Sequence, residues 1–452
     1  RNGTQSGDAV RWDDVTPPDM PDFGRVSMID ASAFDAGTAY VSVRRPLLDD
    51  FRPHIWKTND FGRTWTKIVN GIRDDAYVNA VREDPTRRGL LYAATNHGVY
   101  VSYDDGAHWE ELNPNLPDLP ITSLIVEDNA LAMASHGRGF WVLDNLAPLR
   151  QARAGLTDEA LVLFDPATAY RSANGVILSW WSAGEPSSGR LEVVDASGEV
   201  VRTFHPQDTT VERDRWSGAS LPMEQGLNHL QWDLTTDPWT SFPGMILWGV
   251  RNTAPVVPPG TYTLRLTLDG RTQTSQVEVR ANPWIEDITV ADLQAQYAFG
   301  RRIWEKVDEA NRAVVAIRRA KAQVDERLEA SDDAGLERTA EHFVDNAEEV
   351  EANIYQVRNR SGQDPLNFPI KVNNRLANLL SMSERGDGPP NDGMHEVFQI
   401  MVDELAGYTT RLNEIWETDL AALNRELERL GMDPVDPWDE ETEVPNPLVS
   451  DG

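Results

Sequence analysis

The chain has 452 residues, enough for two to four domains, and carries 73 acidic against 42 basic side chains, a formal net charge of −31. This charge excludes nucleic acids and anionic membrane surfaces as partners, because both are recognised through basic surfaces. The absence of cysteine excludes disulfides and thiolate metal sites. No apolar run approaches the ~20 residues that a membrane-spanning helix needs.

The acidic surplus has two interpretations. It is either a solvated coat that maintains solubility or a means of binding calcium. No D-x-[DN]-x-[DN]-G loop is present, so no metal-ligating residue and no cofactor is predicted, and the solvated coat is favoured.

The first 150 residues read as short strands joined by a repeated turn. Strands are expected over residues 25–32, 38–44 and 54–58 and, in a second repeat, from residue 78 to residue 102. The motif S/T-x-D-x-G-x-x-W closes each repeat, 44 residues apart, at Thr58, Asp60, Gly62 and Trp65 and again at Ser102, Asp104, Gly106 and Trp109. The Asp can accept backbone hydrogen bonds, the Gly supplies a positive φ, and the Trp restarts a strand and fills space between sheets. These residues are therefore predicted to be structural, and the period is typical of β-propeller blades.

A third repeat begins but does not finish. Strands are expected over residues 121–127 and 131–135, and residues 139–142 align with residues 98–101. The turn motif is missing over residues 143–148, where the chain leaves the repeat. Residues 1–150 thus hold between two and a half and three blades, whereas a propeller needs roughly four to eight to close.

The repeated motif resembles the Asp boxes of sialidases, sortilin-type propellers and xyloglucanase-like hydrolases. More narrowly, residues 15–150 resemble the last blades of large secreted bacterial proteins described as sortilin-like or BNR-repeat glycosyl hydrolases, through residues 48–53, 81–85 and 136–141. The resemblance implies a bacterial protein, secreted or in the cell envelope, with more blades upstream. We therefore expect the remaining blades on an N-terminal chain or segment of the same precursor, and the start of this chain, which has no signal peptide, to be a cleavage or cut point.

Residues 151–284 follow a linker at 150–160 and predict a β-sandwich. Candidate strands with long loops and a tight Asp269–Gly270 turn suggest an immunoglobulin- or fibronectin-like module. Tryptophans are frequent here, and they either stack on sugar rings or, as we favour, anchor a core or an interface: Trp180, Trp181, Trp216, Trp232, Trp239 and Trp248.

Residues 285–432 have helical periodicity and predict an antiparallel helical bundle. Thr289 and Asp292 resemble a capping box, a second helix runs from about 336 to 357, a short one covers about 371–383, and the last spans about 392–430. The bundle packs on the propeller or forms an oligomer, and the sequence leaves both open. Residues 433–452 form an acidic, Pro-containing tail.

Few residues point to chemistry. A glycosidase needs two carboxylates across the scissile bond, and nothing in the spacing marks a pair among Asp49, Asp50, Asp74, Asp75, Glu83 and Asp84. His136 and Arg138, in a Gly-flanked turn, and His97 one repeat earlier are candidate ligand-binding residues, since Arg138 can hold a carboxylate or a sugar hydroxyl. The competing interpretation is that they pair with acidic neighbours.

Two functions remain. The first is a propeller protein that binds glycan or protein ligands, with the rest of the propeller supplied elsewhere. The alternative is a glycoside hydrolase whose catalytic carboxylates lie mostly in the absent blades. No arginine triad of a sialidase, phosphate loop, zinc motif or serine-nucleophile elbow is found.

Overall fold

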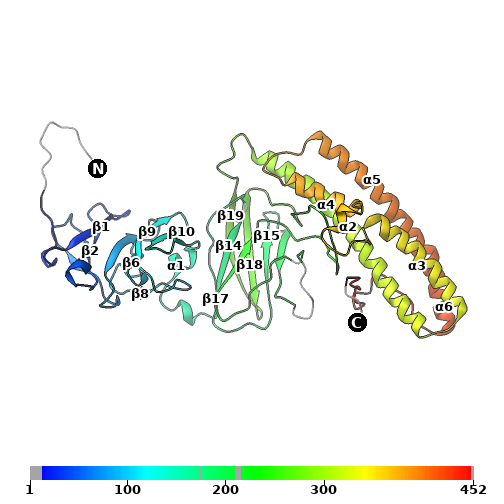
Figure 1. Cartoon of the computed structure of the whole chain (residues 1–452), viewed down its shortest axis with the longest axis horizontal. Coiled ribbons are helices and arrows are strands. Elements are labelled where there is room, and N and C mark those ends of the chain that lie inside the picture. Colours follow the sequence, from blue (N-terminus) through cyan, green and yellow to red (C-terminus); the bar gives the residue numbers. More distant parts are fainter. Residues whose placement is uncertain (1–12, 173–174, 209–214, 217, 449–452) are drawn as a thin grey trace. The chain divides into compact units, whose positions relative to one another are not determined.

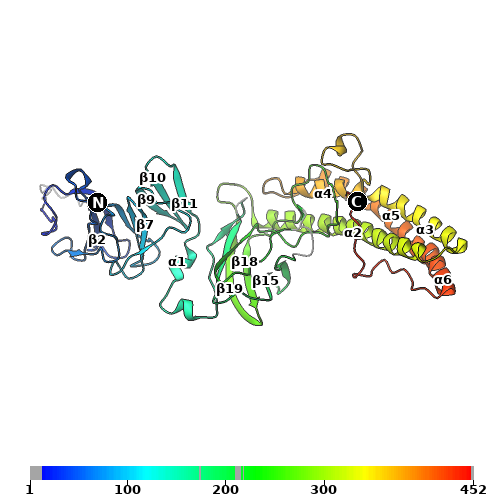
Figure 2. The same ribbon diagram turned by 60° about the horizontal axis from the view of Figure 1, so that its bottom comes forward.

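The computed structural model describes residues 13–172, 175–208, 215–216 and 218–448 (Figure 1). The chain divides into two compact units, one ending at Glu159 and the other beginning at Ala160. Strands dominate the first unit and the start of the second, and helices follow, as Figure 2 also shows. This confirms the prediction of β-sheets followed by a helical region. Among the described residues no helix is both long enough and apolar enough to cross a membrane.

The described part of the first unit contains three antiparallel sheets, in each of which every strand pairs with the next along the chain. The first sheet comprises β1 (Arg25–Ala31), β2 (Ala39–Arg44), β3 (Ile55–Thr58) and β4 (Thr66–Lys67). The second comprises β5 (Val78–Glu83), β6 (Leu91–Thr95), β7 (Gly98–Ser102) and β8 (Glu110–Glu111). The third comprises β9 (Ile121–Glu127), β10 (Ala130–Ser135) and β11 (Phe140–Leu143).

Two apolar cores join these sheets face to face. The core between the first and second sheets includes Tyr40, Ile55, Leu91 and Tyr100. The core between the second and third sheets is built from a different set of side chains, among them Tyr92, Val99, Val101, Leu124 and Leu131. The alternation of strand side chains explains this division, because neighbouring residues of one strand point to opposite faces.

The chain leaves the third sheet through the short helix α1 (Ala147–Gln151) and a 3-10 turn (Leu156–Asp158), both within or beside the expected linker. Arg150 donates from Nε to the buried carboxylate of Asp84 at 2.9 Å. The exit from the repeats is therefore held against the second sheet.

The second unit begins with two sheets that enclose one apolar core. The smaller sheet has the order β12 (Leu161–Leu163), β14 (Val176–Ser182), β17 (Gly226–Trp232). The larger has the order β13 (Ala169–Tyr170), β19 (Arg271–Arg280), β18 (Gly260–Leu268), β15 (Gly189–Val194), β16 (Val200–Phe204). An immunoglobulin or fibronectin topology stays a prediction.

The helices of the second unit pack around another core. Helix α2 (Val290–Glu329) starts at the expected capping box, in which the Thr289 hydroxyl accepts from the Asp292 backbone N–H and the Asp292 carboxylate accepts from that of Thr289. It is followed by α3 (Ala334–Ile354), α4 (Val372–Ser383), α5 (Asp392–Ile415) and α6 (Ala421–Leu430). The last two are joined by a π-helical turn, Trp416–Leu420, inside the single helix expected from periodicity.

The connection between β17 and β18 is irregular, and it supplies side chains to the helical core. Trp239, Phe242, Met245, Leu247 and Val250 are all buried among residues of α2 to α6. Their backbone is also tied to the helices, since Asp308 Oδ1 accepts from the Thr240 N–H at 2.7 Å. The sheets and helices of this unit are therefore linked through one long loop.

Candidate functional site

The two Asp boxes form closely similar turns. In the first, Thr58 Oγ1 accepts from the Gly62 N–H at 2.9 Å and Asp60 Oδ1 accepts from the Thr64 N–H at 2.8 Å. The Thr64 hydroxyl also donates to Asp60 Oδ2 at 2.8 Å, and both hydrogen bonds from Thr64 hold the pKa of Asp60 below its usual value. Trp65 donates from its indole to the carbonyl of Val15 at 2.7 Å.

In the second box, Ser102 Oγ accepts from the Gly106 N–H at 2.9 Å and Asp104 Oδ1 accepts from the His108 N–H at 2.8 Å. The ring of Trp109 lies in the core between the first two sheets and donates to the carbonyl of Ile68 at 3.0 Å. The side chains of both motifs are thus engaged in turns and in contacts with neighbouring segments.

The third sheet exposes one apolar face. Strand register places two cross-strand rows there, one of Phe140 and Ala134 and one of Val142, Ala132 and Ile125. Phe140 is 86%, Val142 59% and Ile125 51% exposed. We call this surface, Ile125, Ala132, Ala134, Phe140 and Val142, the open face.

In the second sheet, the corresponding face is covered by a neighbouring sheet. Its corresponding rows pair Val99 with Ala94 and Val101 with Tyr92, and all four side chains are buried in the core with the third sheet. The open face therefore has the composition of a sheet-packing surface, but no other sheet of the described part of the first unit lies on it. Exposed apolar side chains that are grouped on one surface often mark interaction sites.

The face at the other end of the stack is covered instead. Val41, Val43 and Trp56 of the first sheet are buried together with Met20. The Trp56 indole donates to Asp19 Oδ1 at 2.8 Å. The segment before β1 therefore shields this face from solvent.

The three candidate ligand-binding residues fall in two places. His97 Nδ1 lies 2.8 Å from Asp118 Oδ1, and His97 Nε2 lies 4.0 Å from Asp75 Oδ2. Asp75 in turn forms an ion pair with Arg73, with Arg73 Nε 2.6 Å from Asp75 Oδ1. The Arg73 hydrogen bond lowers the pKa of Asp75.

His136 and Arg138 are exposed in the turn between β10 and β11, directly before Phe140 of the open face. The backbone N–H of Arg138 donates to Ser135 Oγ at 3.1 Å. No hydrogen bond or ion pair joins the side chains of His97, His136 and Arg138 within the described part of the chain. Two of the three thus border the open face, and His97 has acidic neighbours.

The carboxylates considered for hydrolysis are mostly committed to other contacts. Burial raises the pKa of Asp84, but hydrogen bonds from Thr86 and Arg150 outweigh it and keep the pKa below its usual value. Hydrogen bonds from Arg52 lower the pKa of Asp50. Glu83 Oε1 accepts from the Gly89 N–H at 3.1 Å. Asp49 and Asp74 are exposed.

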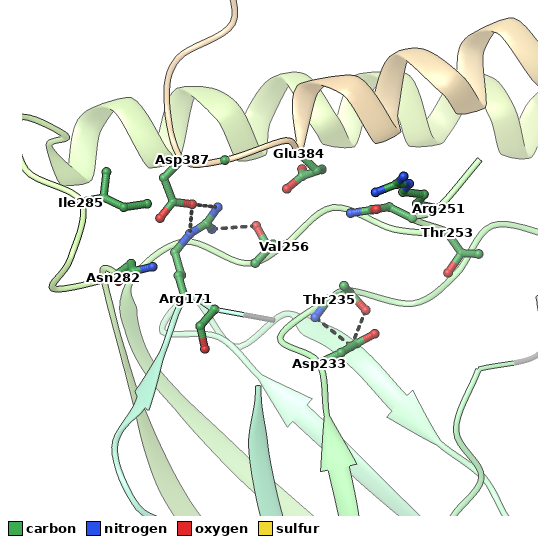
Figure 3. Close-up of a pocket in the computed structure, with 13 residues that line it drawn as sticks. Arg171, Asp233, Thr235, Arg251, Thr253, Val256, Asn282, Ile285, Glu384 and Asp387 are labelled. Carbon is green, nitrogen blue, oxygen red and sulfur yellow. Dashed lines mark hydrogen bonds and ion pairs between the residues drawn. The ribbon is translucent and has the colours of Figure 1, made fainter. Parts of the chain in front are cut away.

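The second unit contains a polar cavity of about 500 Å³ (Figure 3). It lies where β13, β17 and β19 end, beside the loop that follows α4. Lining residues that carry polar side chains are Arg171, Ser172, Asp233, Thr235, Arg251, Asn252, Thr253, Asn282, Glu384 and Asp387.

Arg171 is buried and held by the protein, and Glu384 is half-buried. Arg171 Nε donates to Asp387 Oδ1 at 3.2 Å and Nη2 donates to Gln296 Oε1 at 2.8 Å. Burial raises the pKa of Glu384 to about 7, against the opposing effect of Arg171. Oε1 of Glu384 is inaccessible to solvent and has no hydrogen-bond partner among the described residues.

Sequence reasoning did not find either surface as a site. The strands of the open face were expected, and alternating apolar residues on both faces of the last repeat were the available signal. The residues that line the cavity come from five separate segments of the chain, so no local sequence pattern predicted it. Over the described residues, no group of three or more His, Cys, Asp or Glu side chains is placed to hold a metal ion.

Comparisons with known proteins give only distant similarity. No protein-family profile matches the sequence, and no curated protein matches it. Among solved structures, the chain is similar to a GH74 enzyme from Niastella koreensis, with 13% identity, a TM-score of 0.23, and coverage of 56% of this chain and 46% of the enzyme. It is also similar to YCF48 from Cyanidioschyzon merolae, with 12% identity, a TM-score of 0.20, and coverage of 54% and 71%. CopC from Methylosinus trichosporium OB3b aligns over 28% of this chain and 98% of its own length, with 14% identity and a TM-score of 0.16.

Proposed function

We propose that the first unit is part of an Asp-box β-propeller of a secreted or cell-envelope protein that binds glycan or protein ligands. The open face packs against a further blade supplied by another chain or by another segment of the same precursor. The observation that carries this proposal is the difference between equivalent strands. Val99 and Val101 are buried under the next sheet, whereas Phe140 and Val142, at the corresponding positions, are exposed.

The kind of partner that fits the open face is inferred from what covers the corresponding face of the second sheet. The face that bears Val99 and Val101 meets the third sheet through its Leu124 and Leu131. Burying the exposed Phe and two β-branched side chains would stabilise the contact by several kcal/mol at ~25 cal/mol per Å² of apolar surface. A sheet with a similar row of aliphatic side chains is therefore the partner that fits, and Asp-box blades of this kind supply such rows.

Polar contacts between neighbouring sheets would fix the register of such stacking. Arg44 Nη1 of the first sheet donates to Asn79 Oδ1 of the second at 2.8 Å, and Asn79 Nδ2 donates to the carbonyl of Ile121 of the third at 2.8 Å. A further blade would continue this chain of contacts beyond β9. The ligand would then bind at the ends of the blades, in the central funnel of the closed propeller.

Site-specific crosslinking tests the proposal, because the chain has no cysteine of its own. The purified Phe140→Cys variant is labelled at its cysteine with a photoreactive maleimide, mixed with the rest of the natural precursor and irradiated. We expect crosslinked peptides that contain the motif S/T-x-D-x-G-x-x-W from outside this sequence. A Phe61→Cys variant is the control, since Phe61 is also exposed but belongs to the first Asp-box turn.

Crosslinks from the Phe140→Cys variant to a second copy of this chain would overturn the proposal in favour of self-association. An absence of crosslinks from that variant, with the native mass of a monomer, would overturn it as well. If the blades are found, release of reducing ends from polysaccharides by the assembled complex would establish the alternative, a glycoside hydrolase, and ligand binding without release would support the binding protein.

A further inference from the structure

The polar cavity of the second unit contains groups that the protein itself leaves uncommitted. The guanidinium of Arg251 makes no hydrogen bond or ion pair with any residue the structure describes, and the same holds for the side chains of Asn252 and Thr253. Asp233 uses Oδ1 to accept from Thr235, at 3.1 Å from the N–H and 2.7 Å from the hydroxyl. Its Oδ2 remains available. The lining of this one cavity thus contains both donors and acceptors (Figure 3).

The charges of the lining nearly cancel. Arg171 and Asp387 form an ion pair with each other, so neither presents a free charge. Arg251 and Asp233 are of opposite sign. Glu384 is close to half-protonated at neutral pH, because burial raises its pKa to about 7. A ligand with a full charge would find no counter-charge in excess, whereas a neutral polar ligand would find partners for both its donors and its acceptors.

The segment that borders the cavity after β19 carries an exposed tryptophan. Trp284 lies between Asn282 and Ile285, which both line the cavity, and its backbone N–H donates to Asn282 Oδ1 at 3.0 Å. Trp284 is 90% exposed. An exposed indole offers a flat apolar face on which a ligand can stack. Trp180, Trp216, Trp232 and Trp239 of the same unit are all buried.

We propose that this cavity binds a neutral carbohydrate, one or two pyranose units of a glycan, with Trp284 stacked on the sugar and Arg251, Asp233 and Asn252 bonded to its hydroxyls. The volume of about 500 Å³ falls within the ~300–1,000 Å³ of small-ligand sites. A pyranose combines an apolar C–H face, which could stack on an indole, with a ring of hydroxyls that both donate and accept, which matches the polar lining. Glu384 also lines the cavity, although its Oε1 is inaccessible to solvent.

This site belongs to the second unit and is independent of the proposed packing of blades in the first. The failure of one proposal therefore leaves the other intact. It also differs from the tryptophan row considered from the sequence, since Trp284 was not among those six residues.

Binding of defined sugars to the full chain tests the proposal. Glucose, galactose, mannose, N-acetylglucosamine and cellobiose are titrated by saturation-transfer NMR, with glucuronate as an anionic comparison. We expect at least one neutral sugar to bind with a millimolar Kd. Arg251→Ala and Trp284→Ala should each weaken that binding about fivefold or more, because each removes a contact without leaving a buried group unpaired.

Two variants control for surface changes of the same type. Arg271→Ala removes an exposed arginine at the opposite end of β19, and Trp438→Ala removes an exposed tryptophan of the acidic tail. Both should change Kd less than about twofold. Since Arg251 and Trp284 are exposed, their variants should retain the wild-type circular dichroism spectrum and melting temperature.

The proposal would be overturned if none of the five neutral sugars bound at the highest concentration tested. Binding of glucuronate alone would instead assign the cavity to acidic ligands. Binding that survived both Arg251→Ala and Trp284→Ala unchanged would place the sugar elsewhere on the chain.

Discussion

The second sheet of the first unit, β5–β8, has a neighbouring sheet on each face, whereas the third sheet, β9–β11, has a neighbour on one face only within the described part of that unit. The residue types at matched positions are alike, Val99 and Val101 in one sheet and Phe140 and Val142 in the other. Their side chains differ in exposure because a neighbouring sheet covers Val99 and Val101, and the residue types themselves do not explain the difference. Repeated sheets that stack face to face necessarily leave an end face whose composition resembles a core.

The second unit covers the apolar faces of its sheets and helices in a different way. Its two sheets close on one core and its helices on another, and a loop between β17 and β18 contributes apolar side chains to the helical core. What remains there is a cavity lined mostly by polar groups. The first unit therefore presents an apolar surface suited to another sheet, and the second a polar cavity suited to a small ligand.

The largest expected effect separates the two sheets directly. Val101→Asp would bury an unpaired carboxylate and should lower the free energy of unfolding of the first unit by about 4 kcal/mol. Val142→Asp, at the matched position of the open face, should change it by less than about 0.5 kcal/mol. Urea unfolding of the isolated chain measures both. Equal losses would mean that the open face is covered within this chain.

A pH effect should distinguish the second unit. The folded-state pKa of Glu384, about 7, lies above the value of 4.5 expected for an unfolded chain. The folded state therefore binds the proton more tightly, and the free energy of unfolding falls as pH rises from about 4.5 through 7. At about 1.4 kcal/mol per pKa unit, the loss reaches up to about 3 kcal/mol.

The variant Glu384→Gln isolates this contribution, because it keeps a polar group of similar size that does not titrate. The charged and polar groups facing Glu384, namely Arg171, Asp387 and the Val256 backbone N–H, are unchanged in it. Thermal unfolding between about pH 5 and 8 should show a smaller decline in the variant than in the wild type. Identical slopes would show that Glu384 does not titrate in this range.

A smaller effect compares two turns of the first unit. Gly106 has φ +87°, and a Cβ there would lie 2.5 Å from Ile68 Cδ1 in the core between the first two sheets. Gly106→Ala should therefore cost about 2 kcal/mol of unfolding free energy, from backbone strain and from the clash.

Gly139 is the matched control for this substitution. It also has a positive φ, +73°, but a Cβ added there would meet no described atom within 4 Å in the β10–β11 turn. Gly139→Ala should cost about 1 kcal/mol, the backbone strain alone. A larger loss at Gly139 than at Gly106 would contradict the assignment of the Asp-box glycine to a packed turn.

The smallest expected effect lies at the start of α2. Thr289→Ala removes the cap hydroxyl and should lower the unfolding free energy of the second unit by about 1 kcal/mol. Thr289→Ser retains the hydroxyl and should lie within a few tenths of a kcal/mol of the wild type. If serine and alanine gave the same loss, the contribution would come from the methyl group rather than from capping.

Local chemistry was readable from the sequence by itself. The turns of the Asp boxes, the capping box of α2 and the succession from strands to helices all depend on residues within a few positions of one another, so the spacing of Asp60, Gly62 and Trp65 or of Thr289 and Asp292 was enough to predict them. The helical periodicity was equally local, because one turn of helix repeats every ~3.6 residues.

Only the tertiary structure decided which of these surfaces are covered. Phe140 and Val142 look like buried strand residues in the sequence, and their exposure depends on whether another sheet lies beyond β11. Trp239 and Phe242 lie in an irregular segment, yet they are buried among helices that begin only at Val290. The cavity gathers Arg171, Arg251 and Glu384 from distant segments. Contacts of this kind depend on how the whole chain packs, which short-range spacing of residues does not specify.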